Sequence, residues 1–133
     1  AVLSCGTLEH VTDTDKSLKE INRILKKTGK FFVYMLPNKF SYTEWLAKKR
    51  GINAHPIKYK KKDIFELLQK HGFKIVKISR SNVLPKSMIG LPQLVKNVYG
   101  SMNFIIKPLD WLLSKIPLLN LLSGVFEVIA VKI

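Results

Sequence analysis

Residues 18–36, LKEINRILKKTGKFFVYML, decide the fold of this 133-residue chain. Leu18, Ile21 and Leu25 recur at helical spacing, so the first half of the stretch predicts a helix with one apolar face. Residues 31–36 form a continuous apolar run, which is typical of a strand covered on both faces. A helix followed by a buried strand indicates an α/β domain.

The boundaries of this helix follow from its flanking residues. Asp13 and Asp15 suit the first turn, and Lys26 suits the last turn, because these charges complement the helix dipole. We therefore expect a helix over residues 13–27, stopped by Gly29.

A second helix start follows the buried strand. Ser41 with Glu44 three residues later forms a capping box, in which each side chain binds the other residue's backbone N–H. Phe40 and Trp45 occupy the positions of a hydrophobic staple around it. We expect this helix to run to Arg50.

Further elements continue the α/β pattern outward. Residues 1–4 resemble the end of a short apolar strand. Residues 63–70 predict a helix, and residues 73–79 predict a strand after it. Residues 125–131 predict a last strand.

Residues 82–124 are the least regular part of the chain. Within them, residues 104–122 are rich in Ile and Leu, but Lys107, Asp110 and two prolines interrupt the run, so it does not predict a transmembrane span. Pro108 is expected to open a short helix. That helix either packs over the sheet or forms an amphipathic cap that faces lipid or covers a substrate.

The chain is strongly basic, with 23 Lys and Arg against 9 Asp and Glu and a net charge of +14. Such a charge favours association with polyanions, although lysines can also simply coat solvated helix faces. Cys5 is the single cysteine, which excludes an internal disulfide and a cysteine-rich zinc site. This favours a cytoplasmic location, with peripheral membrane contact as an option for an amphipathic cap.

The order of these patterns resembles a known family. LEHV at residues 8–11, followed by residues 18–31, resembles the "LEHV…L.EI.R.LK.GG.F" stretch of class I S-adenosylmethionine (SAM)-dependent methyltransferases, in particular type 11. Residues 36–38 are similar to the "PN" after the fifth strand. Residues 63–75 look like the helix leading into the sixth strand, and residues 126–131 look like the seventh strand.

The resemblance implies the C-terminal half of a Rossmann-like sheet with strand order 4-5-7-6, an antiparallel last strand and flanking helices. Residues 1–81 would supply the first sheet and helix units of this single partial domain, residues 82–124 a variable helical cap, and residues 125–133 the last strand. The first three strands and the glycine-rich loop would lie outside the chain. The strand at residues 1–4 would then be an exposed edge, and such edges invite dimerisation or association.

The resemblance also implies an enzyme that transfers a methyl group from SAM to a small or lipid-like acceptor, and a fragment that is inactive alone. The alternative is a non-enzymatic basic amphipathic module that binds anionic membrane or a partner chain. Many class I enzymes that act on nucleic acid carry an Asn- or Asp-Pro-Pro-Tyr-like motif after the fourth strand. LEHV stands there instead, which argues against a nucleic-acid substrate.

The cofactor contacts implied by the resemblance are Ser4, Cys5, Gly6 and Thr7, directly after the first strand. Gly6 would let the backbone approach a ligand closely, or it simply forms a strand-to-helix turn. No neighbouring base supports Cys5 as a nucleophile.

Four further residues are candidates on the substrate side. His10 would act as general base or orient a substrate hydroxyl, or it only fixes its loop. Glu9, Asn38 and His55 are candidates for substrate contact, although Asn38 also suits a turn and His55 a solvated loop. Quinone-biosynthesis methyltransferases bind a metal here with Glu-x-x-Glu-His. Gly6 replaces the first Glu, and one carboxylate with one imidazole predicts no metal.

Overall fold

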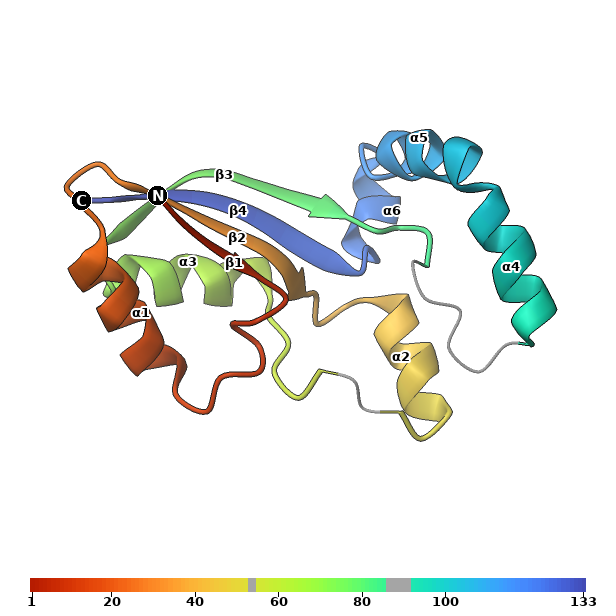
Figure 1. Ribbon diagram of the computed structural model, residues 1–133, viewed down its shortest axis with the longest axis horizontal. Coiled ribbons are helices and arrows are strands. Elements are labelled where there is room, and N and C mark those ends of the chain that lie inside the picture. The colour runs from red at the N-terminus through yellow and green to blue at the C-terminus, as the bar shows by residue number, and fades with distance from the viewer. Residues whose placement is uncertain (53–54, 86–91) are drawn as a thin grey trace.

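The computed structural model describes residues 1–52, 55–85 and 92–133. Strands in these residues form one mixed sheet: β1 (Val2–Cys5), β2 (Lys30–Pro37), β3 (Phe73–Ser81) and β4 (Val125–Lys132). The strand order is β1-β2-β4-β3, as Figure 1 shows. β1 pairs with β2 in parallel, and β4 is antiparallel to both its neighbours. The predicted 4-5-7-6 arrangement with an antiparallel last strand is therefore confirmed.

Helices α1 (Thr14–Ile24) and α3 (Lys61–Lys70) lie along the same side of the sheet (Figure 1). Leu18, which the helical spacing predicted, is the buried residue of α1, and Ile64 and Leu68 are those of α3. The sheet contributes aromatic rings to the same core. The largest fully buried apolar side chains are Phe31, Phe73, Phe126, Leu18, Ile64 and Leu68. This core fixes the helices that carry the loops at the carboxyl end of β1.

The start of α1 agrees with the sequence, but its end does not. Asp13 caps the helix, because its side chain accepts a hydrogen bond from a backbone N–H in the first turn. The helix ends at Ile24 rather than at the predicted Lys27. The Lys132 ammonium of β4 donates to two carbonyls at this end, at 2.6 and 2.9 Å. A contact from the far end of the chain thus satisfies the helix terminus.

Helix α2 (Tyr42–Lys49) follows β2 and has half of the expected cap. The Ser41 hydroxyl accepts a hydrogen bond from the Glu44 N–H at 3.3 Å. The reciprocal bond is absent from the described residues, because the Glu44 carboxylate binds His55 instead. Phe40 and Trp45 are more than half exposed, so the predicted staple is wrong. A tertiary contact has replaced the local one.

A helical cap, residues 92–124, lies beyond the carboxyl end of β3 (Figure 1). Its helices are α4 (Gln93–Ser101), α5 (Asn103–Leu113) and α6 (Pro117–Leu121). Pro108 lies inside α5, so the prediction that it opens the helix is wrong. Asp110 of α5 accepts hydrogen bonds from the backbone N–H groups of Asn82 and Leu84, at 3.2 and 2.6 Å. This contact ties α5 to the loop after β3 and helps position the helix around its proline.

Among the helices of the described residues, none is both long and apolar enough to cross a membrane.

Candidate functional site

The turn after β1 exposes its backbone at the carboxyl end of the parallel pair. Gly6 has a φ of +58°, a left-handed conformation that favours glycine, and its N–H donates to the Tyr34 carbonyl at 3.1 Å. The Thr7 hydroxyl donates to the Cys5 carbonyl at 3.0 Å. Cys5, Gly6 and Thr7 are exposed, so a ligand can approach the chain here.

A bulge in β2 lies beside this turn. The β2–β4 register shifts between Val33 and Leu36, and Met35 has a φ of +66°. A Cβ added at Gly6 would lie 4.0 Å from the Met35 Cβ. Bulges are over-represented near active sites, where they re-aim side chains. The uniform apolar run of residues 31–36 carries no signal of this bulge, and the sequence reasoning missed it.

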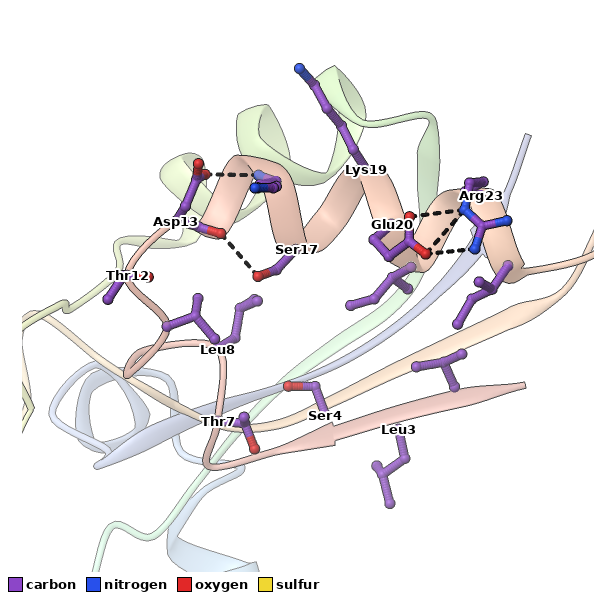
Figure 2. Close-up of a pocket in the computed structure, with 15 residues that line it drawn as sticks. Leu3, Ser4, Thr7, Leu8, Thr12, Asp13, Ser17, Lys19, Glu20 and Arg23 are labelled. Atoms are coloured by element: carbon purple, nitrogen blue, oxygen red, sulfur yellow. Dashed lines mark hydrogen bonds and ion pairs between the residues drawn. The ribbon is translucent and has the colours of Figure 1, made fainter.

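A groove of about 770 Å³ runs between β1 and α1, as Figure 2 shows. Ser4 and Thr7 line it, and the Ser4 side chain points toward α1 while Leu3 points to the other side of the strand. Much of the remaining lining is apolar, including Leu8 and Ile21. Ser4 and Thr7 thus place small polar side chains along a groove with apolar walls, and Cys5 and Gly6 lie between them where β1 ends. Cofactor contact by these four residues stays a prediction.

A polar cluster lies in the loop that follows. Glu9, His10 and His55 each offer a ligand atom, and these atoms lie within 4.8 Å of one another. The His10 and His55 rings are 5.7 Å apart between centroids. The structure therefore unites three of the predicted site residues. The prediction of no metal counted only one imidazole, that of His10. The structure places a second imidazole, that of His55, in the same cluster.

Glu9 is the buried member of this cluster. It is only 1% exposed, and its Oε2 has no hydrogen-bond partner among the described residues. Its Oε1 lies 3.9 Å from the Nε2 of His10, which is itself exposed. Burial raises the pKa of the nearby Tyr59 phenol, and the charge of Glu9 raises it further. The Oε1 atom of Glu9 therefore faces an accessible imidazole, while its Oε2 atom is buried without a partner among the described residues.

Two residues that the sequence reasoning missed hold His55 in place. The Glu44 Oε1 lies 2.6 Å from the His55 Nδ1, and the Lys58 ammonium lies 3.1 Å from the Glu44 Oε2. The contact with Glu44 therefore involves the Nδ1 of His55 and not its Nε2. In the sequence, Glu44 stood out only as a member of the expected capping box, which does not predict a contact with His55.

Asn38 makes its side-chain hydrogen bonds to residues outside the cluster of Glu9, His10 and His55. It is fully buried, and its amide donates to the carbonyls of Leu121 and Ser123, both at 2.9 Å. Its Oδ1 accepts from the Phe40 N–H at 3.1 Å. The amide thus ties the end of β2 to the segment before β4. Substrate contact by Asn38 stays a prediction, and this geometry favours the turn role instead.

Comparison with known proteins finds similarity to methyltransferases. A family model described as a methyltransferase domain matches residues 1–33, which cover β1, α1 and the start of β2. A SAM-dependent methyltransferase from Thermotoga maritima, described as a possible histamine N-methyltransferase, superposes with a TM-score of 0.59 at 19% identity. The chain has a class I methyltransferase fold. The family resemblance read from residues 8–31 is confirmed.

A second methyltransferase structure is similar over the same residues. It is phosphoethanolamine N-methyltransferase 2 of Haemonchus contortus, in complex with phosphomonomethylethanolamine and S-adenosylhomocysteine, with a TM-score of 0.50 at 18% identity. Both superpositions cover 98% of this chain, but only 53% of the first structure and 32% of the second. Comparison with curated protein sequences finds no match.

Proposed function

We propose that the chain is the C-terminal part of a SAM-dependent methyltransferase that acts on a small or lipid-like acceptor. The observation that carries this proposal is the cluster of Glu9, His10 and His55 next to the open backbone at Gly6. In open α/β sheets, ligands bind outside the carboxyl ends of the strands, and the cluster follows such an end. The methyltransferase fold supplies the reaction class.

The turn after β1 would form one wall of the cofactor site. SAM supplies an electrophilic methyl group when it is bound. The left-handed Gly6 keeps side-chain atoms away from this wall, and Ser4 and Thr7 offer hydroxyl groups along the groove. Their part is to bind and orient, because methyl transfer requires an aligned approach of the acceptor.

His10 and His55 would contact the methyl acceptor. His10 is exposed and lies beside the Glu9 carboxylate, so its imidazole can take a proton from an acceptor hydroxyl or amine. His55 is held by Glu44 and adds a second oriented imidazole. Both histidines lie on loops, where substrate contacts concentrate.

Methyl transfer from tritium-labelled SAM tests the proposal. The assay compares these 133 residues with the complete gene product, using small-molecule and lipid extracts as acceptors. We expect transfer by the complete product and none by the 133 residues, since these superpose on only 53% and 32% of the two methyltransferase chains. A complete product that neither binds SAM nor transfers the methyl group would overturn the proposal.

Peripheral binding to anionic membrane is a second candidate function, favoured by the exposed apolar side chains of the cap. Leu94 and Phe104 are each 76% exposed, Trp111 is 60% exposed and Leu118 is 78% exposed. Amphipathic helices bury such residues at the boundary between headgroups and acyl chains. The cap would then bring a lipid-like acceptor toward the site.

Basic side chains around the cap suit anionic headgroups. A pocket of about 660 Å³ between β3, β4 and α5 is lined by Lys77, Arg80, Lys107 and Lys115, among others. The Lys115 ammonium lies 3.5 Å from the centroid of the Trp111 ring, so charge and apolar surface adjoin. Each Lys or Arg near an anionic surface contributes about 1 kcal/mol of attraction.

Vesicle co-sedimentation tests the membrane candidate. We expect binding to phosphatidylglycerol vesicles that weakens with salt, and little binding to phosphatidylcholine. Replacing Phe104 and Leu118 together by Ser should abolish it. Val76→Ser is the matched control, because Val76 is 63% exposed but lies on β3. Equal binding by all three proteins would rule out the cap as the contact.

A further inference from the structure

We propose that Glu9, His10 and His55 bind one divalent transition-metal ion of the zinc type. Their ligand atoms lie within 4.8 Å of one another, although the chain brings them from two separate loops. Glu9 and His10 follow β1, whereas His55 lies between α2 and α3. The inference rests on the side chains and stands whether or not the chain takes part in methyl transfer.

The chemistry of the ligands selects the class of ion. Two imidazoles and one carboxylate form a set that zinc and its neighbours in the first transition row prefer. Calcium and magnesium prefer ligand sets made of oxygen. The set is therefore suited to Zn²⁺ or Co²⁺.

The buried carboxylate oxygen of Glu9 is the second observation that points to a cation. Its Oε2 is buried and has no hydrogen-bond partner among the described residues. A buried charged oxygen without a partner is costly, and a cation is the partner that such an oxygen favours most. Glu9 as a whole is 1% exposed, so bulk water contributes little to its solvation.

The contacts behind His55 have the form of an outer coordination shell. Metal-binding histidines usually donate their second ring N–H to a carboxylate, which fixes the ring and the tautomer. The Glu44 Oε1 lies 2.6 Å from the His55 Nδ1, and Lys58 holds the other oxygen of Glu44. Nε2 is then the nitrogen that binds the ion.

Binding would draw the two loops together. Ligands of a tetrahedral zinc ion lie about 3.4 Å apart, given bonds of about 2.0–2.1 Å. The Glu9 Oε1 and His10 Nε2 atoms are now 3.9 Å apart, so the ion would draw these two together and link the two loops. Three protein ligands leave a fourth position open for water or an acceptor oxygen, and a role for that acceptor rests on the proposed function. With the ion bound, the ligating nitrogens of His10 and His55 are occupied, so His10 would take a proton from an acceptor only in the ion-free protein.

Direct metal titration of the untagged protein tests the site. Co²⁺ should produce the visible bands of a tetrahedral nitrogen and oxygen site, and Zn²⁺ should displace it with a stoichiometry of one in calorimetry. Glu9→Gln and His55→Gln should each weaken Zn²⁺ binding by more than about 100-fold. Glu44→Gln should weaken it by about 10–100-fold, as expected of an outer-shell group.

Glu66→Gln is the matched control, because Glu66 is an exposed carboxylate on α3 that pairs with Lys62. It should bind Zn²⁺ as the unmodified protein does. Circular dichroism of each apo variant separates loss of the site from loss of the fold. Saturating Zn²⁺ should raise the melting temperature of the unmodified protein and of Glu66→Gln, but not of His55→Gln.

Two results would overturn the inference. One is the absence of Zn²⁺ and Co²⁺ binding in the folded protein at millimolar concentration. The other is stoichiometric binding that Glu9→Gln and His55→Gln both leave unchanged. Neither result bears on methyl transfer, so this test and the labelling assay can fail separately.

Discussion

Gly6 combines two requirements at one residue. Its φ of +58° is strained for any side chain, and its N–H binds the Tyr34 carbonyl beside the bulge of β2. The nearest atoms to an added Cβ would be 3.8 and 4.0 Å away, which is ordinary contact. The conformation, rather than crowding within the chain, therefore accounts for the glycine.

Gly6→Ala should cost about 1 kcal/mol of folding stability, because an L-residue pays about 1–2 kcal/mol in the left-handed region. It should also weaken SAM binding by the complete gene product, measured by equilibrium dialysis. Gly51→Ala is the control, since Gly51 has a φ of +76° and nothing lies within 4 Å of its added Cβ. The two variants should lose similar stability, and only Gly6→Ala should lose affinity. Equal affinity in both would remove Gly6 from the cofactor wall.

At the scale of elements, α1 and α3 are joined by polar contacts at one end. Asp15 of α1 lies 2.7 Å from the Lys70 ammonium and 2.9 Å from the His71 Nε2. The Asn22 amide donates to the His71 carbonyl at 2.8 Å. These contacts fix the C-terminal end of α3 against α1.

Asp15→Asn should lower stability at neutral pH, and this loss should fade in acid. The hydrogen bond from Lys70 and its charge lower the pKa of Asp15. A carboxyl with a lowered folded-state pKa stabilises the fold above its unfolded pKa, about 3.9, and this contribution disappears as pH falls through the folded value. Urea unfolding of both proteins at a series of pH values measures the difference.

The exposed pair of Glu66 and Lys62 provides the comparison for this experiment. Glu66→Gln should change stability less than Asp15→Asn, because its partner is exposed and 3.4 Å away, whereas Asp15 also lies 2.9 Å from the Nε2 of the buried His71. A stability gap for Asp15→Asn that stays constant from neutral pH into acid would show that charge is not its cause.

The whole molecule has a mixed sheet with α1 and α3 on one side and the helical cap beyond the carboxyl end of β3 (Figure 1). Within the described residues β1 has one neighbour, β2, so its other edge has no partner strand there. The groove of Figure 2 lies between this strand and α1. Leu3 of this strand is 61% exposed. An unpaired strand edge with an exposed apolar residue favours association with another chain.

We expect the 133-residue chain to dimerise in a concentration-dependent way through β1. Leu3→Lys should shift it toward monomer, because a charge on an edge strand opposes pairing. Val76→Lys is the control, since Val76 is 63% exposed on β3, the strand at the other edge. Size-exclusion chromatography with light scattering measures the mass. A monomer at high concentration, or a dimer unaffected by Leu3→Lys, would contradict this expectation.

The sequence by itself determined the elements and their order. The helical spacing of Leu18 and Ile21, the apolar run at residues 31–36 and the family resemblance predicted a sheet whose last strand is antiparallel. These signals are local, because periodicity and capping depend on residues within a few positions of one another. The family resemblance also identified Ser4, Thr7, Glu9, His10 and His55 as candidates.

Only the tertiary structure decided how those candidates meet. It brought His55 to Glu9 and His10, turned the Glu44 carboxylate from its own cap to His55, and placed a bulge at Met35. Each of these depends on the path of the chain between distant segments, which no local pattern encodes. The elements were therefore readable from short-range spacing and the strand order from the family resemblance, whereas the candidate metal site arose from long-range packing.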